Sequence, residues 1–422
     1  MKKNKKPVAS LNQINNIFET LLQDFPSDLV ESAKEFEAFR RGRKIKKVAQ
    51  LFQIVLLYCG LDYSLRETAG TLTLLGTEIT DQSVSDRLSG CVAWLSHLLK
   101  EMLPSLPVQM SQQIGRRWIL IDGSTVQVRG ARGTSYRIHL GWDWVTQTIV
   151  ELRISDAKTG ESLKLYEIQA GDVVTADRGY ARYPELSYVL GKGGDVIIRY
   201  APHILPLLDE KGEVFKLADE LWASESPIMT KKVVCKKDQS KQELYLHCFR
   251  LPAEKAAEVK RKKCAKAKKE GITLKKETLE YAEWTMILTS LEATQISAEE
   301  IGKMYRLRWQ IEIVIKRLKS CLEIDNLRSR EGSKLSEVYL LGKSLYALMI
   351  EKRAGKLKET KEIEWRVWKI IADQVRPIIT QVWKWKEEYI ELAMNQLRER
   401  KRRRKRQSQL ACELINILQS TN

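Results

Sequence analysis

Two acidic residues follow apolar segments that have the composition of buried strands. Asp122 follows the run Trp-Ile-Leu-Ile at 118–121, and Asp177 follows Val-Val-Thr-Ala at 173–176. Taken alone, an acid beside such a run commonly turns outward or caps a neighbouring group. If both strands bring their carboxylates to one place, the two charges repel at neutral pH unless a divalent cation lies between them. Because hard oxygen ligands suit Mg²⁺, the pair is a candidate metal site.

A third acid, Glu312, lies in a segment whose spacing predicts one long helix from about 298 to 321. Four polar residues of this segment are spaced at 0, 3, 7 and 14, namely Tyr305, Arg308, Glu312 and Lys319. At about 100° per residue they fall within roughly 60° of one another, while the apolar residues cluster on a separate face that can pack on a sheet. The alternative is a solvated face, because an i, i+4 ion pair contributes only a few tenths of a kcal/mol. Tyr305 fits that alternative poorly.

The elements that would carry these acids indicate an α/β fold. We expect three antiparallel strands first, and then strands that alternate with short helices, which is typical of a ribonuclease-H-like mixed sheet. The expected strand segments lie at 118–122, 125–128, 136–144, 148–154, 173–177, 196–200 and 284–289, and the expected helical stretches at 161–168 and 184–190.

The sequence pattern divides the chain into five parts. Residues 113–200 and 284–345 would form the two parts of the ribonuclease-H-like catalytic core, separated by an inserted, β-rich subdomain at 201–283. Helical spacing dominates the flanking regions. We expect DNA binding from the N-terminal region 1–112, and the C-terminal region 346–422 ends in a basic tail.

Several features of the sequence could contact DNA. A helical segment at 65–75, a turn at 76–78 and a helix that begins near Thr80 have the outline of a helix-turn-helix. Many helical domains share that outline, so DNA reading and simple packing are both open. Basic residues cluster at 40–47, 255–269 and 398–406 and could bind phosphates. A solvated surface is the alternative for the second cluster, and a solubilising or localisation segment for the third.

The composition narrows the class of partner. Lys and Arg total 72 against 54 Asp and Glu, and the formal net charge of +18 favours polyanionic partners, although ribosomal and membrane-surface proteins share such a charge. Seven scattered cysteines without C-x-x-C spacing fit free thiols in a reducing cytosol, and four histidines supply a zinc site poorly. No apolar run suits a signal peptide or a membrane span, so we expect a soluble cytoplasmic protein with no membrane partner.

The polar stripe has the spacing Y-x2-R-x3-E-x6-K, which resembles the signature of one large group of bacterial insertion-sequence DDE transposases. The sequence Asp-Gly-Ser from Asp122 looks like the first motif of that group, and Asp-Arg-Gly-Tyr from Asp177 looks like its second. The long insertion between the second acid and the glutamate is also similar. The resemblance covers about residues 115 to 345.

For the acids, this resemblance implies a site for two metal ions. Asp122, Asp177 and Glu312 would hold two Mg²⁺ ions, for which Mn²⁺ can substitute. One ion would activate water or a terminal 3′-hydroxyl, and the other would stabilise the leaving oxygen of the cut phosphodiester.

The resemblance also implies contacts with DNA. Arg308 and Lys319 would hold phosphates beside the cut, Tyr305 would contact the DNA backbone, and Arg178 in the second motif would bind DNA as well. Trp284 stands 28 residues before the glutamate, a position similar to that of the family tryptophan on which a flipped base stacks when a hairpin end forms. A tryptophan that opens a strand is otherwise more often a core residue.

These features predict a transposase that binds the terminal inverted repeats of an insertion sequence, cleaves at its ends and transfers the 3′-hydroxyl strands into target DNA. Its expected partners are double-stranded DNA of the ends and the target, and a second copy in a homodimeric synaptic complex, at the bacterial nucleoid. A repurposed ribonuclease-H-like nuclease and an inactive DNA-binding remnant are the alternatives. The presence of all three acids argues against the remnant.

Overall fold

The computed structural model describes residues 17–103, 116–355 and 366–397, apart from positions 129, 238, 293, 295, 328, 330 and 331. The chain divides into two compact units, which we call the helical unit (Met1–Trp94 with Asp373–Asn422) and the sheet unit (Leu95–Ala372). The basic run at 398–406 lies outside the described residues.

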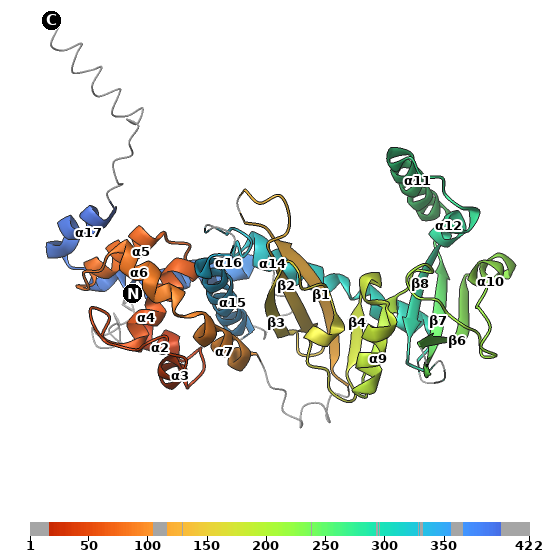
Figure 1. The fold of residues 1–422 in the computed structure, drawn as a ribbon, viewed down its shortest axis with the longest axis horizontal. Helices are drawn as coiled ribbons and strands as arrows, with labels where there is room; N and C mark the ends of the chain where they lie inside the picture. Colours follow the sequence, from red (N-terminus) through yellow and green to blue (C-terminus); the bar gives the residue numbers. More distant parts are fainter. Residues whose placement is uncertain are drawn as a thin grey trace, which may run out of the picture. The chain divides into compact units, whose positions relative to one another are not determined.

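Within the described part of the sheet unit, the strands are β1 (Trp118–Val126), β2 (Tyr136–Asp143), β3 (Thr148–Asp156), β4 (Val173–Ala176), β5 (Asp195–Arg199), β6 (Ile228–Lys237), β7 (Ser240–Arg250) and β8 (Trp284–Thr289). They form one mixed sheet in the order β3-β2-β1-β4-β5-β8-β7-β6 (Figure 1). β1, β2 and β3 are antiparallel neighbours, while β4 and β5 run parallel to β1. The predicted α/β class with a ribonuclease-H-like mixed sheet is therefore confirmed.

The inserted segment extends this sheet. β6 and β7 form an antiparallel hairpin, and β7 pairs with β8 from Arg250 opposite Trp284 to Tyr245 opposite Thr289. β8 in turn pairs with β5, so the insertion shares its hydrogen bonds with the core. The basic segment at 255–269 lies in the helix α11 (Ala253–Glu270). The helices that follow the strands of this unit are α9 (Tyr183–Gly191), α10 (Leu217–Ala223), α11 (Ala253–Glu270), α12 (Lys276–Glu280), α13 (Ala298–Arg306), α14 (Trp309–Ser320) and α15 (Lys334–Gly355).

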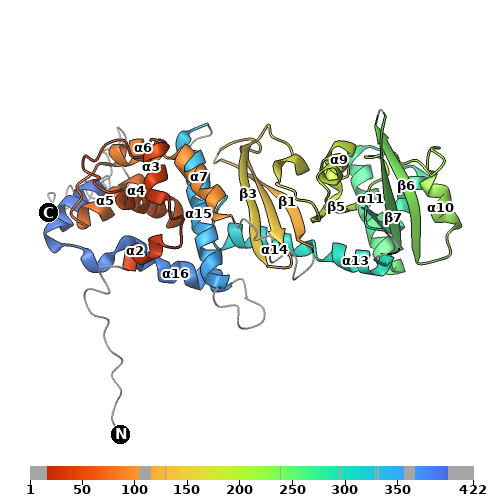
Figure 2. The same cartoon turned by 90° about the horizontal axis from the view of Figure 1, so that it is seen from below.

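Helices cover both faces of the sheet. α9 packs with Ile119 and Val196 on one face, and α13 packs with Val173 and Ile197 on the other. Figure 2 shows α9 and α13 on opposite sides of β5. α14 continues along the second face to β1. Because side chains alternate along a strand, Asp122 lies on the face that α13 and α14 cover.

The long helix expected at 298–321 is in fact two helices, since α13 ends at Arg306 and α14 begins at Trp309. Between them the backbone N–H groups bond three residues back instead of four, from Leu307 to Met304, Arg308 to Tyr305, Gln310 to Leu307 and Ile311 to Arg308. Such a tightened turn places residues i and i+3 nearly in line. The regular 100° spacing assumed for the polar stripe was therefore wrong across this joint, and Tyr305 lies directly beside Arg308.

Two local expectations also differ from the structure. The segments at 118–122 and 125–128 were expected as separate strands, but β1 runs without interruption to Val126. Asp122 thus lies within β1, and β2 pairs with β1 both at Asp122 and beyond it. The expected helix at 161–168 is only a 3₁₀ turn at Leu163–Leu165, because Ser162 caps a single turn there.

The described part of the helical unit contains α2 (Ile17–Leu22), α3 (Leu29–Glu35), α4 (Val48–Val55), α5 (Leu65–Leu74), α6 (Asp81–Ser89) and α17 (Ile390–Leu397), while α7 (Val92–Met102) and α16 (Arg366–Thr380) each cross a unit boundary. Segments distant in sequence meet in this unit. The Gln53 side chain donates to the Ile379 carbonyl at 2.7 Å, and α17 packs on α5, where a Cβ on Gly70 would lie 3.5 Å from Leu397. In the described residues, no helix combines the length and the apolar character needed to cross a membrane.

Candidate functional site

The two aspartates occupy equivalent positions in the register of β1 and β4, Asp122 within β1 and Asp177 directly after β4. Leu120 of β1 lies opposite Thr175 of β4, an offset of 55 residues in a parallel pair. The same offset, continued two residues, pairs position 122 with position 177. Since neighbouring strands lie about 4.8 Å apart, the register brings Asp122 and Asp177 to one place at the end of β4.

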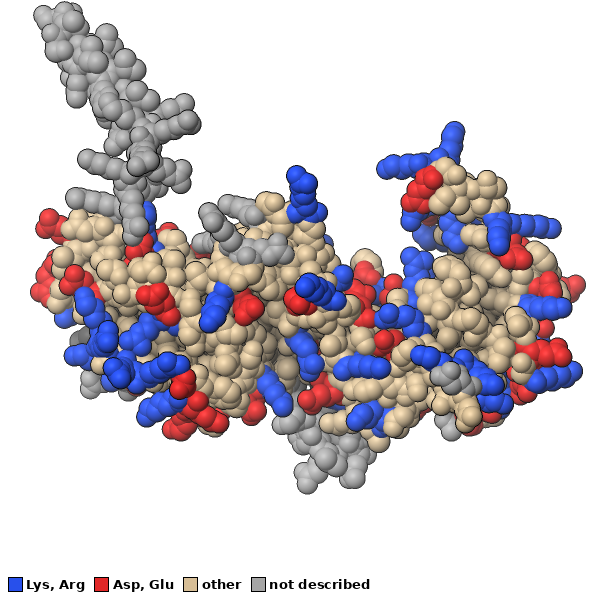
Figure 3. Space-filling view, viewed as in Figure 1, with Lys and Arg blue, Asp and Glu red and all other residues tan. Residues whose placement is uncertain are grey.

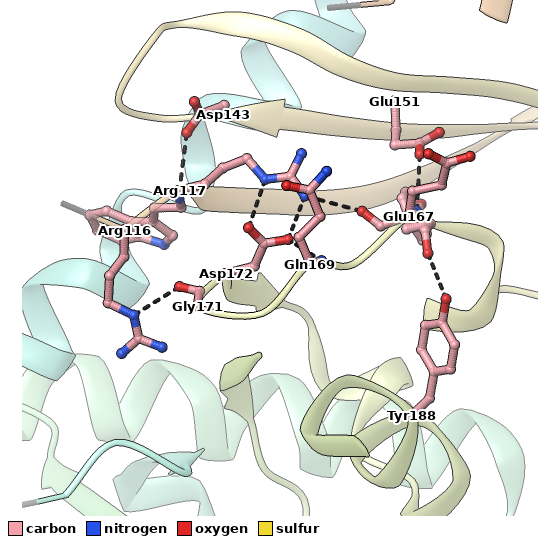
Figure 4. A network of polar contacts seen from close by, with 11 residues as sticks. Arg116, Arg117, Asp143, Glu151, Glu167, Gln169, Gly171, Asp172 and Tyr188 are labelled. Carbon is pink, nitrogen blue, oxygen red and sulfur yellow. Dashed lines mark hydrogen bonds and ion pairs between the residues drawn. The ribbon is translucent and has the colours of Figure 1, made fainter. Parts of the chain in front are cut away.

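A network of polar contacts at the other end of these strands fixes that register (Figure 4). Arg117, just before β1, donates from Nε to the Asp172 carboxylate at 2.8 Å and forms an ion pair with it. Asp172, just before β4, also accepts from the Gln169 backbone N–H at 2.7 Å. Arg116 donates to the Gly171 carbonyl at 2.8 Å. These contacts hold the beginnings of β1 and β4 together, and with them the positions of the two acids.

Arg308 joins the first and third acids. Its Nη2 atom lies 2.6 Å from Glu312 Oε1 and its Nη1 atom lies 3.7 Å from Asp122 Oδ2. The Arg308 side chain is only 17% exposed. One largely buried guanidinium therefore faces two carboxylates from different elements, β1 and α14.

Tyr305 connects Asp177 to the Arg308 guanidinium. Its hydroxyl donates to Asp177 Oδ1 at 3.4 Å, and the Arg308 guanidinium lies 5.9 Å from the centre of its ring. Burial raises the pKa of Tyr305 to about 12, so the hydroxyl keeps its proton at neutral pH. The tightened turn between α13 and α14 makes this arrangement possible, because it places the two side chains on one side.

Lys319 lies further along β1. Its ammonium group donates to the Thr125 carbonyl at 3.1 Å and lies 3.7 Å from the Asp325 carboxylate. The structure thus gathers Asp122, Asp177, Glu312, Tyr305 and Arg308. Lys319 lies beside Thr125, three residues after Asp122 on β1.

The surroundings of Asp122 raise the pKa of its carboxyl group. Burial raises the pKa of Asp122 to about 6, while the Gly123 backbone N–H, 2.8 Å from Oδ1, and the Arg308 charge lower it. The carboxylates of Glu312 and Glu161 raise it further. An additional cation would stabilise the ionised form of this group.

The donor set fits a hard divalent cation, because it consists of carboxylate oxygens on a partly buried face. In the described residues, however, no three acidic, imidazole or thiol groups converge closely enough to hold an ion. Arg308 forms ion pairs with two of the three candidate acids, and only the pair with Glu312 is a hydrogen bond.

Glu161 is a nearby acid that sequence reasoning missed. A Cβ on Gly123 would lie 3.0 Å from one Glu161 carboxylate oxygen, and a Cβ on Gly179 would lie 3.7 Å from the other. The glycines that follow both aspartates therefore leave room for this side chain, which also lies 3.5 Å from Arg137. It stands in the irregular segment after β3, where the helix expected at 161–168 gave no reason to place it beside the aspartates.

Arg178 and Trp284 line a separate pocket of about 400 Å³ that begins next to Asp177. Arg199, Lys263 and Lys275 also line it, so four cations and a single carboxylate, that of Glu277, face one hollow. Burial and the charges of Arg178 and Arg199 lower the pKa of Lys263. A pocket of this composition suits an anion such as a phosphodiester. Arg199 could have been recognised from sequence, because it follows the apolar run at 196–198 as Asp122 and Asp177 follow theirs.

Trp284 itself is a largely buried residue of the core. Its side chain is 3% exposed, it packs with Met286 and Leu288 on the face opposite α13, and the Arg250 guanidinium covers its ring at 4.6 Å. Its indole N–H has no hydrogen-bond partner in the described structure. A base could meet this ring only from the pocket side.

Comparisons with known proteins agree on one family. The model of the family described as "Transposase DDE domain" matches residues 114–347. InsL of insertion sequence element IS186A and the transposase for IS421, both from Escherichia coli, are each 30% identical over 77% of this chain and 90% of their own length. A transposase for IS231F from Bacillus thuringiensis is 21% identical over 80% of this chain and 82% of its own. Among solved structures, the piggyBac transposase synaptic complex with hairpin DNA matches at a TM-score of 0.38 and 10% identity, over 97% of this chain and 89% of that one. The description of the fold therefore rests on the strand order alone.

Proposed function

This chain belongs to the family of DDE transposases, and we propose that it cleaves DNA at the ends of an insertion sequence and transfers the 3′-hydroxyl strands into target DNA. Within the family, we assign it to the group with the Y-x2-R-x3-E-x6-K signature. The observation that carries the proposal is the link, through Tyr305 and Arg308, between acids from β1, the end of β4 and α14.

In this proposal, Asp122, Asp177 and Glu312 hold two Mg²⁺ ions, for which Mn²⁺ can substitute. When bound, such ions supply an activated nucleophilic oxygen and stabilise the leaving oxygen of the phosphodiester. Arg308 releases its carboxylates and turns to a DNA phosphate, which its buried, fork-shaped guanidinium suits. Tyr305 positions Asp177 and contacts the DNA backbone, and Lys319 holds a phosphate further along β1.

The cationic pocket then binds the strand beside the cut. Arg178 follows Asp177 directly, so a phosphate bound there lies next to the acids. Lys263 belongs to α11, whose exposed lysines extend a basic surface away from the pocket. Trp284 forms part of the pocket wall, where it can stack on a base that leaves the duplex.

Replacing Trp284 with alanine should impair hairpin formation more than first-strand nicking, because only the hairpin step needs the displaced base. Both steps can be followed on one gel with an end-labelled duplex. Equal loss in the two steps would assign Trp284 to the core alone, consistent with its 3% exposure. The substitution Trp222→Ala is a matched control, since Trp222 is 46% exposed and outside the pocket lining.

The function is tested with purified protein and the DNA that flanks its gene. With Mg²⁺, we expect nicks at the terminal inverted repeats and joining of the 3′-hydroxyl ends to a target plasmid, and neither product with EDTA. We further infer that two copies assemble on a pair of ends in a synaptic homodimer, in the bacterial cytoplasm at the nucleoid. Cutting without joining would identify a repurposed nuclease. DNA binding without cutting would identify an inactive remnant.

A further inference from the structure

Glu161 lies next to the two aspartates, and the proposed function leaves it without a role. Its two carboxylate oxygens lie beside the glycines that directly follow the aspartates. A Cβ on Gly123 would lie 3.0 Å from Glu161 Oε1, and a Cβ on Gly179 would lie 3.7 Å from Oε2. A side chain at position 123 would therefore displace the carboxylate, whereas glycine leaves its place open. Both motifs thus make room for one shared acid.

Contacts with the beginning of α9 fix the backbone at Glu161. The Arg182 guanidinium donates to the Glu161 carbonyl at 2.6 Å. The Ser162 hydroxyl donates to the carboxylate of Glu185 at 2.8 Å, and the Leu163 backbone N–H donates to the same carboxylate at 2.5 Å. Glu185 is buried in α9, which follows the turn after the second aspartate. The fold therefore holds Glu161 and that aspartate together.

The Glu161 carboxylate has unused capacity to bind a cation. In the described residues it has one ion pair, with Arg137 at 3.5 Å, and accepts no hydrogen bond. Its side chain is 38% exposed. Figure 3 shows acidic side chains at the surface over β4 and α9, with basic ones next to them. An ion from the solvent can therefore reach this carboxylate.

A buried tyrosine hydroxyl close to Glu161 lacks a hydrogen-bond partner. The Tyr180 side chain is 1% exposed, and its hydroxyl has no partner among the described residues. Burial raises the pKa of Tyr180, and the charge of Glu161 raises it further, so the hydroxyl keeps its proton. Tyr166 lies beside it but donates to the Asp122 carbonyl at 3.4 Å. Because buried donors are almost always paired, an acceptor such as a carboxylate or an ion-bound water belongs next to Tyr180.

Glu161 approaches the aspartates from the face of the sheet opposite Arg308. Side chains alternate along β1, so the space beside Gly123 opens on the α9 face, while Asp122 points to α13 and α14. β4 ends at Ala176, and the chain then leaves the sheet in a 3₁₀ turn. Beyond that end, no strand of the described chain lies on this side of β1. Carboxylates from the two faces can therefore meet at one ion there.

We propose that Glu161 is a fourth acidic ligand of the cation site, which binds one divalent ion together with Asp122 and Asp177, and that the Tyr180 hydroxyl orients its carboxylate. Carboxylate oxygens suit Mg²⁺ and Mn²⁺. Counted with Glu312, the four carboxylates have only two guanidinium partners in the described residues, so further positive charge stabilises them. That the ion serves DNA cleavage rests on the proposed function.

The test measures Mn²⁺ binding to the DNA-free protein at pH 8, with free Mn²⁺ followed by its electron paramagnetic resonance signal. Glu161→Gln keeps the size of the side chain and removes its charge, so it should weaken Mn²⁺ binding by about tenfold to a hundredfold. The control Glu167→Gln removes the same charge from an exposed position of the same segment and should leave the affinity unchanged. Equal affinities of the two variants would overturn the proposal.

Tyr180→Phe tests the orienting hydroxyl in the same titration and should weaken Mn²⁺ binding by about tenfold. Tyr183→Phe is its matched control. The Tyr183 hydroxyl is also buried without a partner in the described residues, but it lines a hollow with Lys164 and Lys237 instead of approaching the acids. An unchanged affinity in Tyr180→Phe would overturn the role of this hydroxyl.

Gly123→Ala supplies an independent test of the place that Glu161 occupies. It should weaken Mn²⁺ binding in the unaltered background and add nothing in a Glu161→Ala background, where the new Cβ has room. An equal loss in both backgrounds would overturn that placement.

The outcomes for this ligand and for the proposed function can be told apart. Weaker Mn²⁺ binding in Glu161→Gln, in a protein that neither cleaves nor joins DNA with Mg²⁺, would support the ligand and contradict the proposed function only. An unaltered protein that binds no Mn²⁺ would overturn the ligand, whatever its activity on DNA.

Discussion

The variant Glu312→Gln should bind element ends as tightly as the unaltered protein and cleave them at least about a hundredfold to a thousandfold more slowly. The amide oxygen can still accept the hydrogen bond that Arg308 Nη2 makes at 2.6 Å, so the local structure is retained. What is lost is the negative charge, which a carboxylate needs to hold a divalent ion. Single-turnover nicking of a labelled end duplex with Mg²⁺ measures the effect.

The substitution Glu299→Gln is the matched control for this variant. It removes the same charge from an exposed position on α13, where the side chain does not approach the acids, and should leave the nicking rate unchanged. Cleavage by Glu312→Gln at the original rate would contradict the role of Glu312. Equal losses in the two variants would show that net charge, rather than a ligand, had been removed.

The variant Arg308→Gln should show two opposite effects. Cleavage should fall by about a hundredfold, because the group proposed to hold the phosphate is lost. Binding of Mn²⁺ to the DNA-free protein should become about tenfold tighter, because a cation no longer competes for Asp122 and Glu312. The titration is done at pH 8, where Asp122, with a pKa of about 6, is ionised in the original protein. Free Mn²⁺ is followed by its electron paramagnetic resonance signal.

Arg306→Gln supplies the control for this second experiment. Arg306 is exposed and donates to the Gly302 carbonyl instead of to the acids, so neither cleavage nor Mn²⁺ affinity should change. Weaker Mn²⁺ binding in Arg308→Gln would mean that Arg308 orders the carboxylates for the metal rather than competing with it. That result would contradict the proposed competition between Arg308 and the metal for the carboxylates.

The strands that carry the aspartates could be predicted from sequence because their signal is local. A run of apolar residues that ends in an acid describes both β1 around Asp122 and β4 before Asp177. That the core sheet is mixed could also be predicted, from the alternation of strands and helices. That Asp122 and Asp177 share one register position depends on the pairing of two strands distant in sequence, which the structure alone provides.

The joint between α13 and α14 could not be predicted, because the sequence around Leu307 contains neither Pro nor Gly to mark a break. A change from four-residue to three-residue hydrogen bonds leaves the apolar spacing nearly unaltered over so short a stretch. The stripe of polar residues was nevertheless informative, because it identified Tyr305 and Arg308 as neighbours of Glu312.

Contacts between distant segments could not be predicted from the sequence either. The pairing of β7 with β8 places Arg250 over Trp284, and only this contact shows that one side of the indole is covered. Likewise, the union of the N-terminal helices with the segment from Asp373 in one unit involves pairs such as Gln53 and Ile379, which no local pattern relates.

The position of Arg308 has a thermodynamic consequence. The guanidinium forms ion pairs with Asp122 and Glu312, and in the proposed function those acids and a DNA phosphate compete for the same positive charge. A cation that neutralises the acids frees the guanidinium for phosphate, and a phosphate that attracts the guanidinium frees the acids for the cation. By linkage, each ligand then increases the affinity for the other by the same factor. In the proposed function, the site would then favour being either empty or fully loaded, so that its reactive state would be assembled only on DNA.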